Sequence, residues 1–170
     1  MIITGTDERP VSTVEPPLPE AAYRLVNPFF EALLRSPLHS LVSDRLLLIT
    51  FTGRRSGEEF TTPVAYDREG ETLAIISTTD SNWWRNLRGG QPVRIHLRSE
   101  RRRAVAELTE DTETVAQYLR RYIERNGTEN TGVVGVRIEK CHTPTLDELR
   151  QAAETIVVVR VYLDGSWKGS

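Results

Sequence analysis

The feature that most restricts the fold of this chain is a series of short strand-forming segments with little sequence between them. Segments 45–53 (RLLLITFTG) and 58–67 (EEFTTPVAYD) are separated by four residues, and segment 71–79 (ETLAIISTT) follows the turn Asp67–Gly70. All three are rich in Leu, Ile, Val, Phe and Thr, which favour strands. Strands joined by such short connections pair as antiparallel hairpins, so the sequence predicts an antiparallel sheet.

Two more regions extend this sheet. Segments 92–100 (PVRIHLRSE) and 102–110 (RRAVAELTE) predict a second hairpin around Ser99 and Glu100. Their polar and apolar residues alternate, as in strands with one exposed face and one buried face. The last segment, 155–163 (TIVVVRVYL), is apolar enough to predict a strand in the middle of the sheet.

Helical patterns flank the strands. Apolar spacing over 19–37 predicts one kinked helix or two short ones, because Pro28 interrupts the pattern and Pro37 ends it. The other helices are expected at 80–90 with Asp80 or Ser81 as N-cap, at 111–127 ending at Gly127, and at 145–154 opened by the capping box Thr145-x-x-Glu148. Segment 132–140 is compatible with a strand or with irregular structure. Runs of strands with helices beside them indicate an α+β fold, and the close spacing favours a barrel-like sheet.

Length and composition indicate one globular domain. The chain has 170 residues, and we expect a flexible leader over 1–18 and a single domain over 19–170. The only cysteine, Cys141, excludes an internal disulfide. No apolar run approaches the roughly 20 residues that span a bilayer, and the first residues contain no apolar signal core. We therefore expect a cytoplasmic protein without a membrane span. The sequence does not determine the oligomeric state, and a homodimer is compatible with it.

The turn between the first two strands has an unusual composition for a hairpin. It reads Gly53-Arg54-Arg55-Ser56-Gly57, although a plain turn needs only a residue that tolerates positive φ. Glycines allow backbone N–H groups to converge on an anion, and arginine adds a planar pair of donors. The loop therefore indicates a phosphate or carboxylate site, although solvated charges at a hairpin tip explain it equally simply. It is not a Walker loop, because the lysine and the following helix are missing.

Several motifs in the same order resemble the deazaflavin (F420)-dependent nitroreductase and quinone reductase family. The resemblance covers about residues 46–97. Members of this family bind coenzyme F420 on a split β-barrel related to flavin-binding, pyridoxamine-phosphate-oxidase-like proteins. The matching positions are Gly53, Arg54, Arg55, Ser56, Gly57, Thr62, Pro63, Val64, Ser77, Trp83, Asn86 and Leu87.

The resemblance implies an α+β split β-barrel that transfers a hydride from reduced F420 to a small electrophile, such as a quinone, a nitroaromatic or an activated alkene. It implies that Arg54, Arg55, Ser56 and Gly57 hold the phosphate-bearing tail. It also implies that Thr61, Thr62, Pro63 and Val64 border the deazaflavin ring, with Ser77, Thr78, Trp83 and Trp84 completing the cofactor site. Adjacent tryptophans point about 100° apart on a helix, so one is expected to pack inside while the other lines the pocket. Asn86 is expected to hold local backbone.

The sequence departs from the family in two places. The segment between Ser77 and Trp83 lacks a glycine-rich insert, and the C-terminal region lacks the tyrosine-rich substrate wall. Tyr118 and Tyr122 lie on the apolar stripe of their helix and are interpreted as core. We assign no catalytic acid or base, because hydride chemistry belongs to the cofactor.

Two other functions fit parts of the sequence. The same barrel would suit a protein that binds flavin mononucleotide (FMN) or haem. A non-enzymatic module could instead bind RNA or another polyanion through Arg94, Arg98 and Arg101–Arg103, but no aromatic residue lies between Arg85 and Arg103 to stack on bases. We therefore expect no nucleic-acid partner. Metal binding has no ligand spacing to support it, and Cys141-His142 is a poor catalytic pair because sequence neighbours rarely meet side chain to side chain.

Overall fold

The computed structural model describes residues 10–13, 46–98 and 100–163. The helix expected over 19–37 and most of the expected leader lie outside these residues. The strands and helices in chain order are β1 (Val11–Thr13), β2 (Leu46–Thr52), β3 (Glu59–Glu69), β4 (Thr72–Thr78), the 3₁₀-helix η2 (Trp83–Leu87), β5 (Gln91–Leu97), β6 (Glu100–Thr109), α2 (Thr112–Asn126), the 3₁₀-helix η3 (Thr128–Val134), β7 (Val136–Ile138), α3 (Leu146–Ala153) and β8 (Ile156–Leu163).

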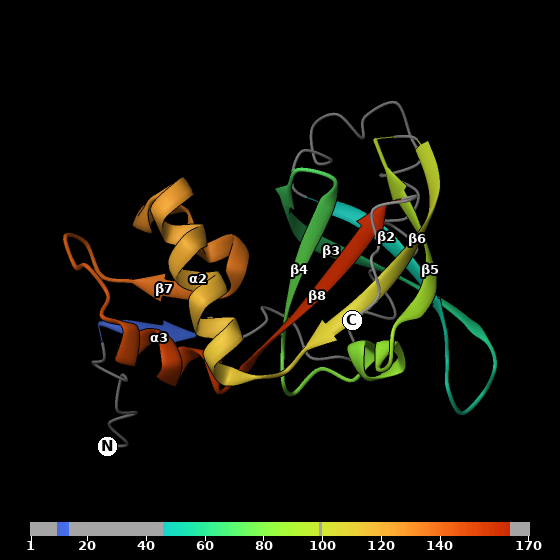
Figure 1. Ribbon diagram of the computed structural model, residues 1–170, viewed down its shortest axis with the longest axis horizontal. Helices are drawn as coiled ribbons and strands as arrows, with labels where there is room; N and C mark the ends of the chain where they lie inside the picture. The colour runs from blue at the N-terminus through green and yellow to red at the C-terminus, as the bar shows by residue number, and fades with distance from the viewer. Residues whose placement is uncertain (1–9, 14–45, 99, 164–170) are drawn as a thin grey trace, which may run out of the picture.

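Six strands close into a barrel in the order β2-β3-β4-β8-β6-β5. Every neighbouring pair is antiparallel, and β2 pairs with β5 to close the ring. The two predicted hairpins are present, and β8 lies between β4 and β6 as its apolar sequence predicts. With helices packed outside the barrel (Figure 1), the predicted α+β split-barrel class is confirmed.

The barrel interior is one apolar cluster formed by alternate residues of each strand. Leu47, Ile49 and Phe51 of β2 belong to it, as do Leu73 and Ile75 of β4. Because side chains alternate along a strand, Ala74 and Ile76 of β4 point to the outer face, where they contact a second cluster. β4 therefore contributes to both clusters, one with each face.

The second cluster joins the helices to one outer face of the barrel. It contains Val115, Leu119 and Tyr122 of α2 and Leu149 of α3 together with Val158 of β8. Figure 1 shows α2, α3 and the small sheet of β1 and β7 gathered on one side of the barrel. The predicted core positions of both α2 tyrosines are confirmed, since Tyr118 and Tyr122 are buried.

Capping explains where the helices begin. The Thr145 side chain accepts a hydrogen bond from the Glu148 backbone N–H, and Glu148 bonds back to the Thr145 backbone, as the predicted capping box requires. The expected N-cap of η2 at Asp80 or Ser81 is wrong. Asn82 is its N-cap and gives no side-chain capping bond, because a five-residue 3₁₀-helix leaves few N–H groups to satisfy.

Three further details differ from expectation. β3 continues through Asp67 to Glu69, so the turn predicted at Asp67–Gly70 is confined to its last part. Residues 11–13, placed by sequence in the leader, form β1 and pair with β7. Segment 132–140 divides between η3 and β7. None of the described helices has the length and apolar character that a membrane crossing requires.

Candidate functional site

The β2–β3 loop is a closed turn with its own backbone hydrogen bonds. The Gly53 N–H donates to the Glu58 carbonyl at 2.8 Å, and the Gly57 N–H donates to the Gly53 carbonyl at 2.9 Å. Gly57 has φ +71°, which favours glycine. A Cβ at Gly53 would lie 2.7 Å from both Phe60 Cε2 and Ser56 Oγ. Gly57 is therefore required by the backbone of this loop, and a side chain at Gly53 would displace Phe60 or Ser56.

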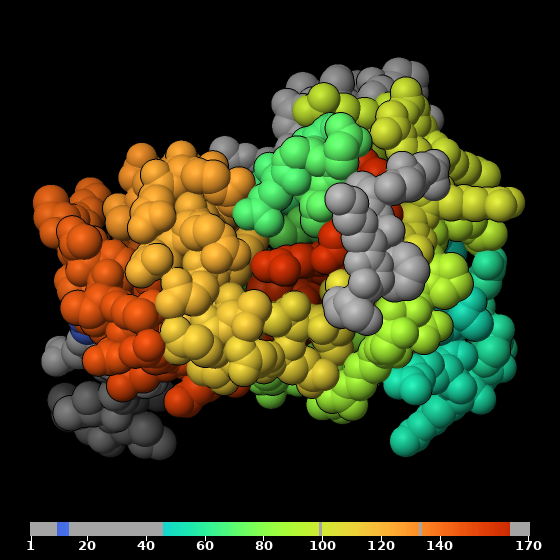
Figure 2. Space-filling view, viewed as in Figure 1, coloured from blue at the N-terminus to red at the C-terminus, as the bar shows by residue number. Residues whose placement is uncertain are grey.

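The two arginines of the loop are exposed at the end of the barrel. Figure 2 shows the β2–β3 region, coloured teal, projecting at one corner of the molecule. Arg54, Arg55 and Ser56 are exposed, and within the described part of the chain neither guanidinium forms an ion pair. The Ser56 hydroxyl accepts from the Glu58 N–H at 3.2 Å. The loop thus presents two positive charges to whatever lies beside it.

A hydrogen bond connects this loop to η2. The Arg54 backbone N–H donates to Asn86 Oδ1 at 3.0 Å, and Asn86 Nδ2 donates to the Trp83 carbonyl at 3.0 Å. Asn86 therefore holds backbone in place, as predicted, and it does so for both segments at once. The structure brings together two motifs that lie about thirty residues apart in sequence.

Next to this junction, β3 separates from β4. The two strands pair only from Tyr66↔Ile75 to Glu69↔Thr72, so from Glu59 to Ala65 β3 pairs with β2 alone among the described strands. Pro63 lies in this part, opposite Leu48. Proline supplies no ladder donor, so it suits a segment that pairs with β2 and not with β4.

The four residues Thr61–Val64 divide between the two faces of β3. Their cross-strand partners show the faces: Val64 lies opposite Leu47 and Thr62 opposite Ile49, which belong to the barrel interior. Thr61 and Pro63 therefore face outward, and the Thr61 hydroxyl lies 2.8 Å from that of Thr50. Of these four residues, Thr62 and Val64 therefore lie on the inward face of the barrel.

An aromatic group lies beside the part of β3 that does not pair with β4. The Phe51 ring stacks on Phe60 with centroids 6.0 Å apart and lies 5.9 Å from Trp83. Trp83 Nε1 donates to Ser77 Oγ at 3.1 Å, which fixes the indole against the β4 side. Phe60 is 43% exposed. Sequence reasoning missed Phe51 and Phe60, because aromatic residues in strands are ordinarily interpreted as core, and only the register shows that both lie beside this part of β3.

The second tryptophan has a different role. Trp84 is 3% exposed, and its Nε1 donates to the Thr78 carbonyl at 3.0 Å. Arg85 and Arg88 each lie 5.3 Å from its ring centroid. Trp84 is therefore the tryptophan that packs inside, while Trp83 is partly buried against the barrel core. The Thr78 contribution is its backbone carbonyl, which is occupied by Trp84.

The charge beyond η2 is balanced. Arg88 donates to Glu110 through Nε at 3.0 Å and Nη2 at 2.7 Å, and these hydrogen bonds lower the pKa of Glu110. Arg94 pairs with Glu59 at 2.7 Å. Arg54 and Arg55, which are the residues predicted to hold an anionic tail, are exposed and have no carboxylate partner among the described residues.

Other chemistry finds little support. The described residues contain no group of three or more His, Cys, Asp and Glu side chains that could hold a metal ion. His142 Nε2 lies 3.0 Å from Glu148 Oε2 rather than against the exposed Cys141. The His142 ring therefore contacts Glu148, which agrees with the interpretation of Cys141-His142 as a poor catalytic pair.

The geometry defines a class: a closed antiparallel barrel in which β3 pairs with β4 only from Tyr66 to Glu69, with a cationic loop between β2 and β3. Comparison with known protein families then identifies the family to which the chain belongs. The model of the F420H(2)-dependent quinone reductase family matches residues 34–138, more than half of the chain. The chain belongs to this family, and the resemblance found in the sequence is confirmed. Its cofactor, coenzyme F420, is the one predicted.

The chain is also similar to several solved structures. An F420 reductase is 15% identical, with 79% of this chain and 93% of that chain covered and a TM-score of 0.43. A putative pyridoxamine 5'-phosphate oxidase from Listeria innocua is 11% identical, with 77% and 94% covered and a TM-score of 0.45. An FAD and heme binding protein from Mycobacterium smegmatis is 18% identical, with 74% and 68% covered and a TM-score of 0.42. No curated protein sequence matches the chain.

Proposed function

We propose that this protein transfers a hydride from reduced coenzyme F420 to a small electrophile of the quinone, nitroaromatic or activated-alkene type. Family membership supports the cofactor and the reaction type. The single observation that carries the site assignment is the hydrogen bond from the Arg54 N–H to Asn86 Oδ1. It joins the cationic loop to the helix that bears Trp83, so that one elongated ligand can contact both.

The loop suits the anionic tail of the cofactor. Arg54 and Arg55 are exposed and lack carboxylate partners within the described residues, while Gly53 and Gly57 give the loop its tight shape. A guanidinium binds a phosphate with two parallel hydrogen bonds. Because the charges lie at the rim and not inside the barrel, a tail bound there leaves the segment where β3 and β4 do not pair for the ring.

The segment where β3 and β4 do not pair suits a planar ring. Trp83, Phe51 and Phe60 supply flat apolar surface on one side, and Val64 packs against the barrel core beside them. Thr62 and Ser77 add hydroxyl groups on the inward face. Bound F420 supplies the hydride, and the protein contributes by holding the ring in a fixed orientation and keeping water from one of its faces.

The test is a fluorescence titration of purified protein with F420 and, separately, with FMN. Wild-type protein is expected to bind F420 more tightly than FMN. Arg55→Ala should raise the Kd for F420 about ten- to a hundredfold, the effect of losing a charge-assisted hydrogen bond of about 1.5–3 kcal/mol. Arg121→Ala is the matched control, because Arg121 is an exposed arginine of α2 and its removal changes the net charge equally.

Two outcomes would contradict the proposal. Tighter binding of FMN than of F420 would mean that the cofactor is a flavin. If Arg55→Ala and Arg121→Ala weakened F420 binding equally, only the overall charge would matter. The β2–β3 loop would then not be the binding site of the tail. Turnover is measured with reduced F420 and a simple water-soluble quinone, nitroaromatic or alkene, and the acceptor class with the highest kcat/KM identifies the reaction.

A further inference from the structure

Two side chains of α2 bond to the same carboxylate of β3. The Tyr118 hydroxyl donates to Asp67 Oδ2 at 3.1 Å, and Arg125 Nη2 donates to the same oxygen at 2.6 Å. Arg125 Nη2 also lies 3.2 Å from Glu69 Oε1. Tyr118 is 1% exposed and the Asp67 side chain 12% exposed. Charge-assisted hydrogen bonds that are shielded from water in this way are stronger than exposed ones.

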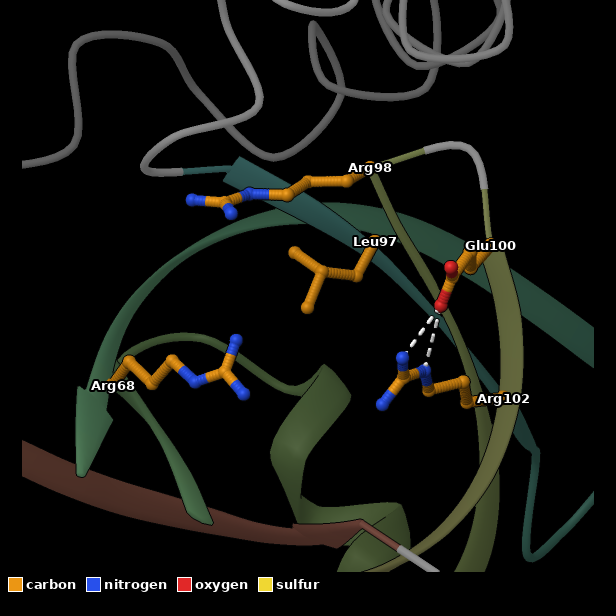
Figure 3. A pocket seen from close by; sticks show the side chains of 5 residues that line it. All are labelled: Arg68, Leu97, Arg98, Glu100 and Arg102. Carbon is orange, nitrogen blue, oxygen red and sulfur yellow. Dashed lines mark hydrogen bonds and ion pairs between the residues drawn. The ribbon is translucent and has the colours of Figure 1, made fainter. Parts of the chain in front are cut away.

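The faces of β3 explain why α2 reaches this carboxylate. Asp67 lies opposite Ala74 of β4, and Ala74 belongs to the same outer cluster as Tyr118. Residues directly opposite each other share a face, so Asp67 points outward. The next residue, Arg68, points the other way and lines a cavity at the end of the barrel together with Arg102 (Figure 3). Ala74 carries only a methyl group, which leaves space for the Tyr118 ring to reach β3.

The bonds from α2 meet β3 next to the point where it leaves β4. The two strands pair only from Tyr66 to Glu69, so Asp67 is one residue from the last pair. Beyond Tyr66, toward the β2–β3 loop, β3 pairs with β2 alone among the described strands. Tyr66 packs in the barrel core and holds the inward side of this point, while Asp67 holds the outward side. The course of the following segment, which carries Thr62 and Val64, therefore depends on both.

From these observations we infer that Tyr118 is a positioning residue for the deazaflavin ring, because by holding Asp67 it sets the course of the β3 segment beside the ring. The inference rests on the proposed function, which assigns the ring to this segment. The tail should depend on Tyr118 only through the ring. Glu59, at the loop end of β3, lies eight residues from Asp67, about 26 Å of extended strand, and the loop has its own link to η2 through Asn86.

A second tyrosine of α2 offers a matched comparison. Tyr122 lies one turn further along the helix and is also buried. Its hydroxyl donates to the Asn130 carbonyl at 3.2 Å, and Asn130 belongs to η3. The Tyr118 bond thus joins α2 to the barrel, whereas the Tyr122 bond joins α2 to η3. Replacing either tyrosine with phenylalanine removes one hydroxyl and keeps the ring in the core.

The test is a fluorescence titration of Tyr118→Phe and Tyr122→Phe with oxidised F420 and with a deazaflavin that lacks the phosphate-bearing tail. Tyr118→Phe should raise the Kd for both ligands about three- to tenfold, because both contain the ring. Tyr122→Phe should lower the urea midpoint of unfolding by a similar amount and leave both Kd values within about twofold of wild type. Circular dichroism establishes that each variant is folded.

A double variant tests whether Tyr118 acts through Asp67. Asp67→Ala removes the acceptor, so adding Tyr118→Phe to it should change the Kd for the tail-less deazaflavin less than Tyr118→Phe changes it in wild type. Additive losses would overturn the inference. Asp67→Asn keeps an oxygen acceptor for the Tyr118 hydroxyl, and its Kd should lie between those of wild type and Asp67→Ala.

Two further results would overturn the inference. Equal rises in Kd in Tyr118→Phe and Tyr122→Phe would mean that any loosening of α2 weakens binding. A wild-type Kd for the tail-less deazaflavin in folded Tyr118→Phe would mean that the ring does not depend on this bond. In both cases wild-type protein still binds F420, so the inference fails alone. If wild-type protein does not bind F420, the proposed function fails and the inference fails with it.

Discussion

The Arg54 backbone N–H lies 3.0 Å from Asn86 Oδ1, and this bond joins the β2–β3 loop to η2. Asn86 uses its other side-chain group to donate to the Trp83 carbonyl at 3.0 Å. One amide side chain thus sets the position of the cationic loop relative to the indole. If the cofactor tail and ring bind on either side of it, the geometry of the whole site depends on this residue.

Asn86→Ala should therefore weaken F420 binding although Asn86 is not assigned to the ligand. It removes two hydrogen bonds worth about 0.5–1.5 kcal/mol each, so the free energy of unfolding should fall by about 1–3 kcal/mol, and the Kd for F420 should rise. Asn86→Asp keeps the acceptor for the Arg54 N–H and loses the donor to the Trp83 carbonyl. Its stability and its Kd for F420 should therefore lie between those of wild type and Asn86→Ala. Urea unfolding and F420 titration measure both effects. Wild-type affinity in folded Asn86→Ala would show that the loop does not need this link.

The tight approach of Gly53 to Phe60 gives a second prediction. A Cβ at position 53 would lie 2.7 Å from Phe60 Cε2. Phe60 is 43% exposed, so its ring can move away, and we expect Gly53→Ala to lower stability by less than about 1 kcal/mol. The displaced ring should nevertheless weaken F420 binding, because it no longer stacks on Phe51.

A double variant tests this explanation. In Gly53→Ala/Phe60→Ala the contact with the ring is gone, so adding Gly53→Ala to Phe60→Ala should change the Kd for F420 less than adding it to wild type. Titrations of the four proteins give the coupling. Purely additive losses would mean that Gly53 acts through the loop backbone or Ser56 and not through Phe60.

The hydrogen bond between Trp83 and Ser77 gives a third prediction. Ser77→Ala leaves the half-buried Trp83 N–H without its 3.1 Å acceptor, at a cost of about 1 kcal/mol in unfolding free energy. The indole should then be held less firmly against β4, and F420 affinity should fall. Ser77→Thr keeps a hydroxyl and serves as the control. An unchanged Kd in Ser77→Ala, with the expected loss of stability, would place Trp83 outside the ligand contact.

Local sequence signals predicted much of the fold. The two hairpins, the apolar strand β8 and the Thr145–Glu148 capping box each depend on residues close together in the chain. The closure of β2 on β5 and the separation of β3 from β4 after Tyr66 depend on the register of the whole barrel. For that reason the inward positions of Phe60, Arg68 and Arg102 could not be predicted. The pairing of β1 with β7, at opposite ends of the chain order, was missed on the same grounds.

The site shows the same division. The β2–β3 loop and the tryptophan pair are recognisable from their residue types and order. The sequence does not show which tryptophan is buried. That depends on the hydrogen bonds from Trp84 to the Thr78 carbonyl and from Trp83 to Ser77 Oγ. Thr61 and Pro63 were grouped with Thr62 and Val64 in sequence, and the pleat of β3 then divided them.

The last prediction concerns the junction of α2 and α3. Arg150 of α3 donates to Glu113 of α2 through Nε at 2.6 Å and Nη2 at 3.2 Å. These bonds, with a further one from Gln117, lower the pKa of Glu113 from 4.5 to about 2. A carboxyl group whose pKa is lower in the folded protein stabilises the fold at pH values above its ordinary pKa. That contribution is lost as the pH falls toward the lowered pKa.

Glu113→Gln should therefore be less stable than wild type at pH 6, and the difference in unfolding free energy should shrink from pH 4.5 downward and vanish near pH 2. Glu124→Gln, whose ion pair with Arg120 lies within α2 alone, is the control and should show a smaller dependence. Urea unfolding at pH 6, 4, 3 and 2 measures the difference, and a gap between wild type and Glu113→Gln that stays constant over this range would show that the Arg150–Glu113 pair does not link the two helices in solution.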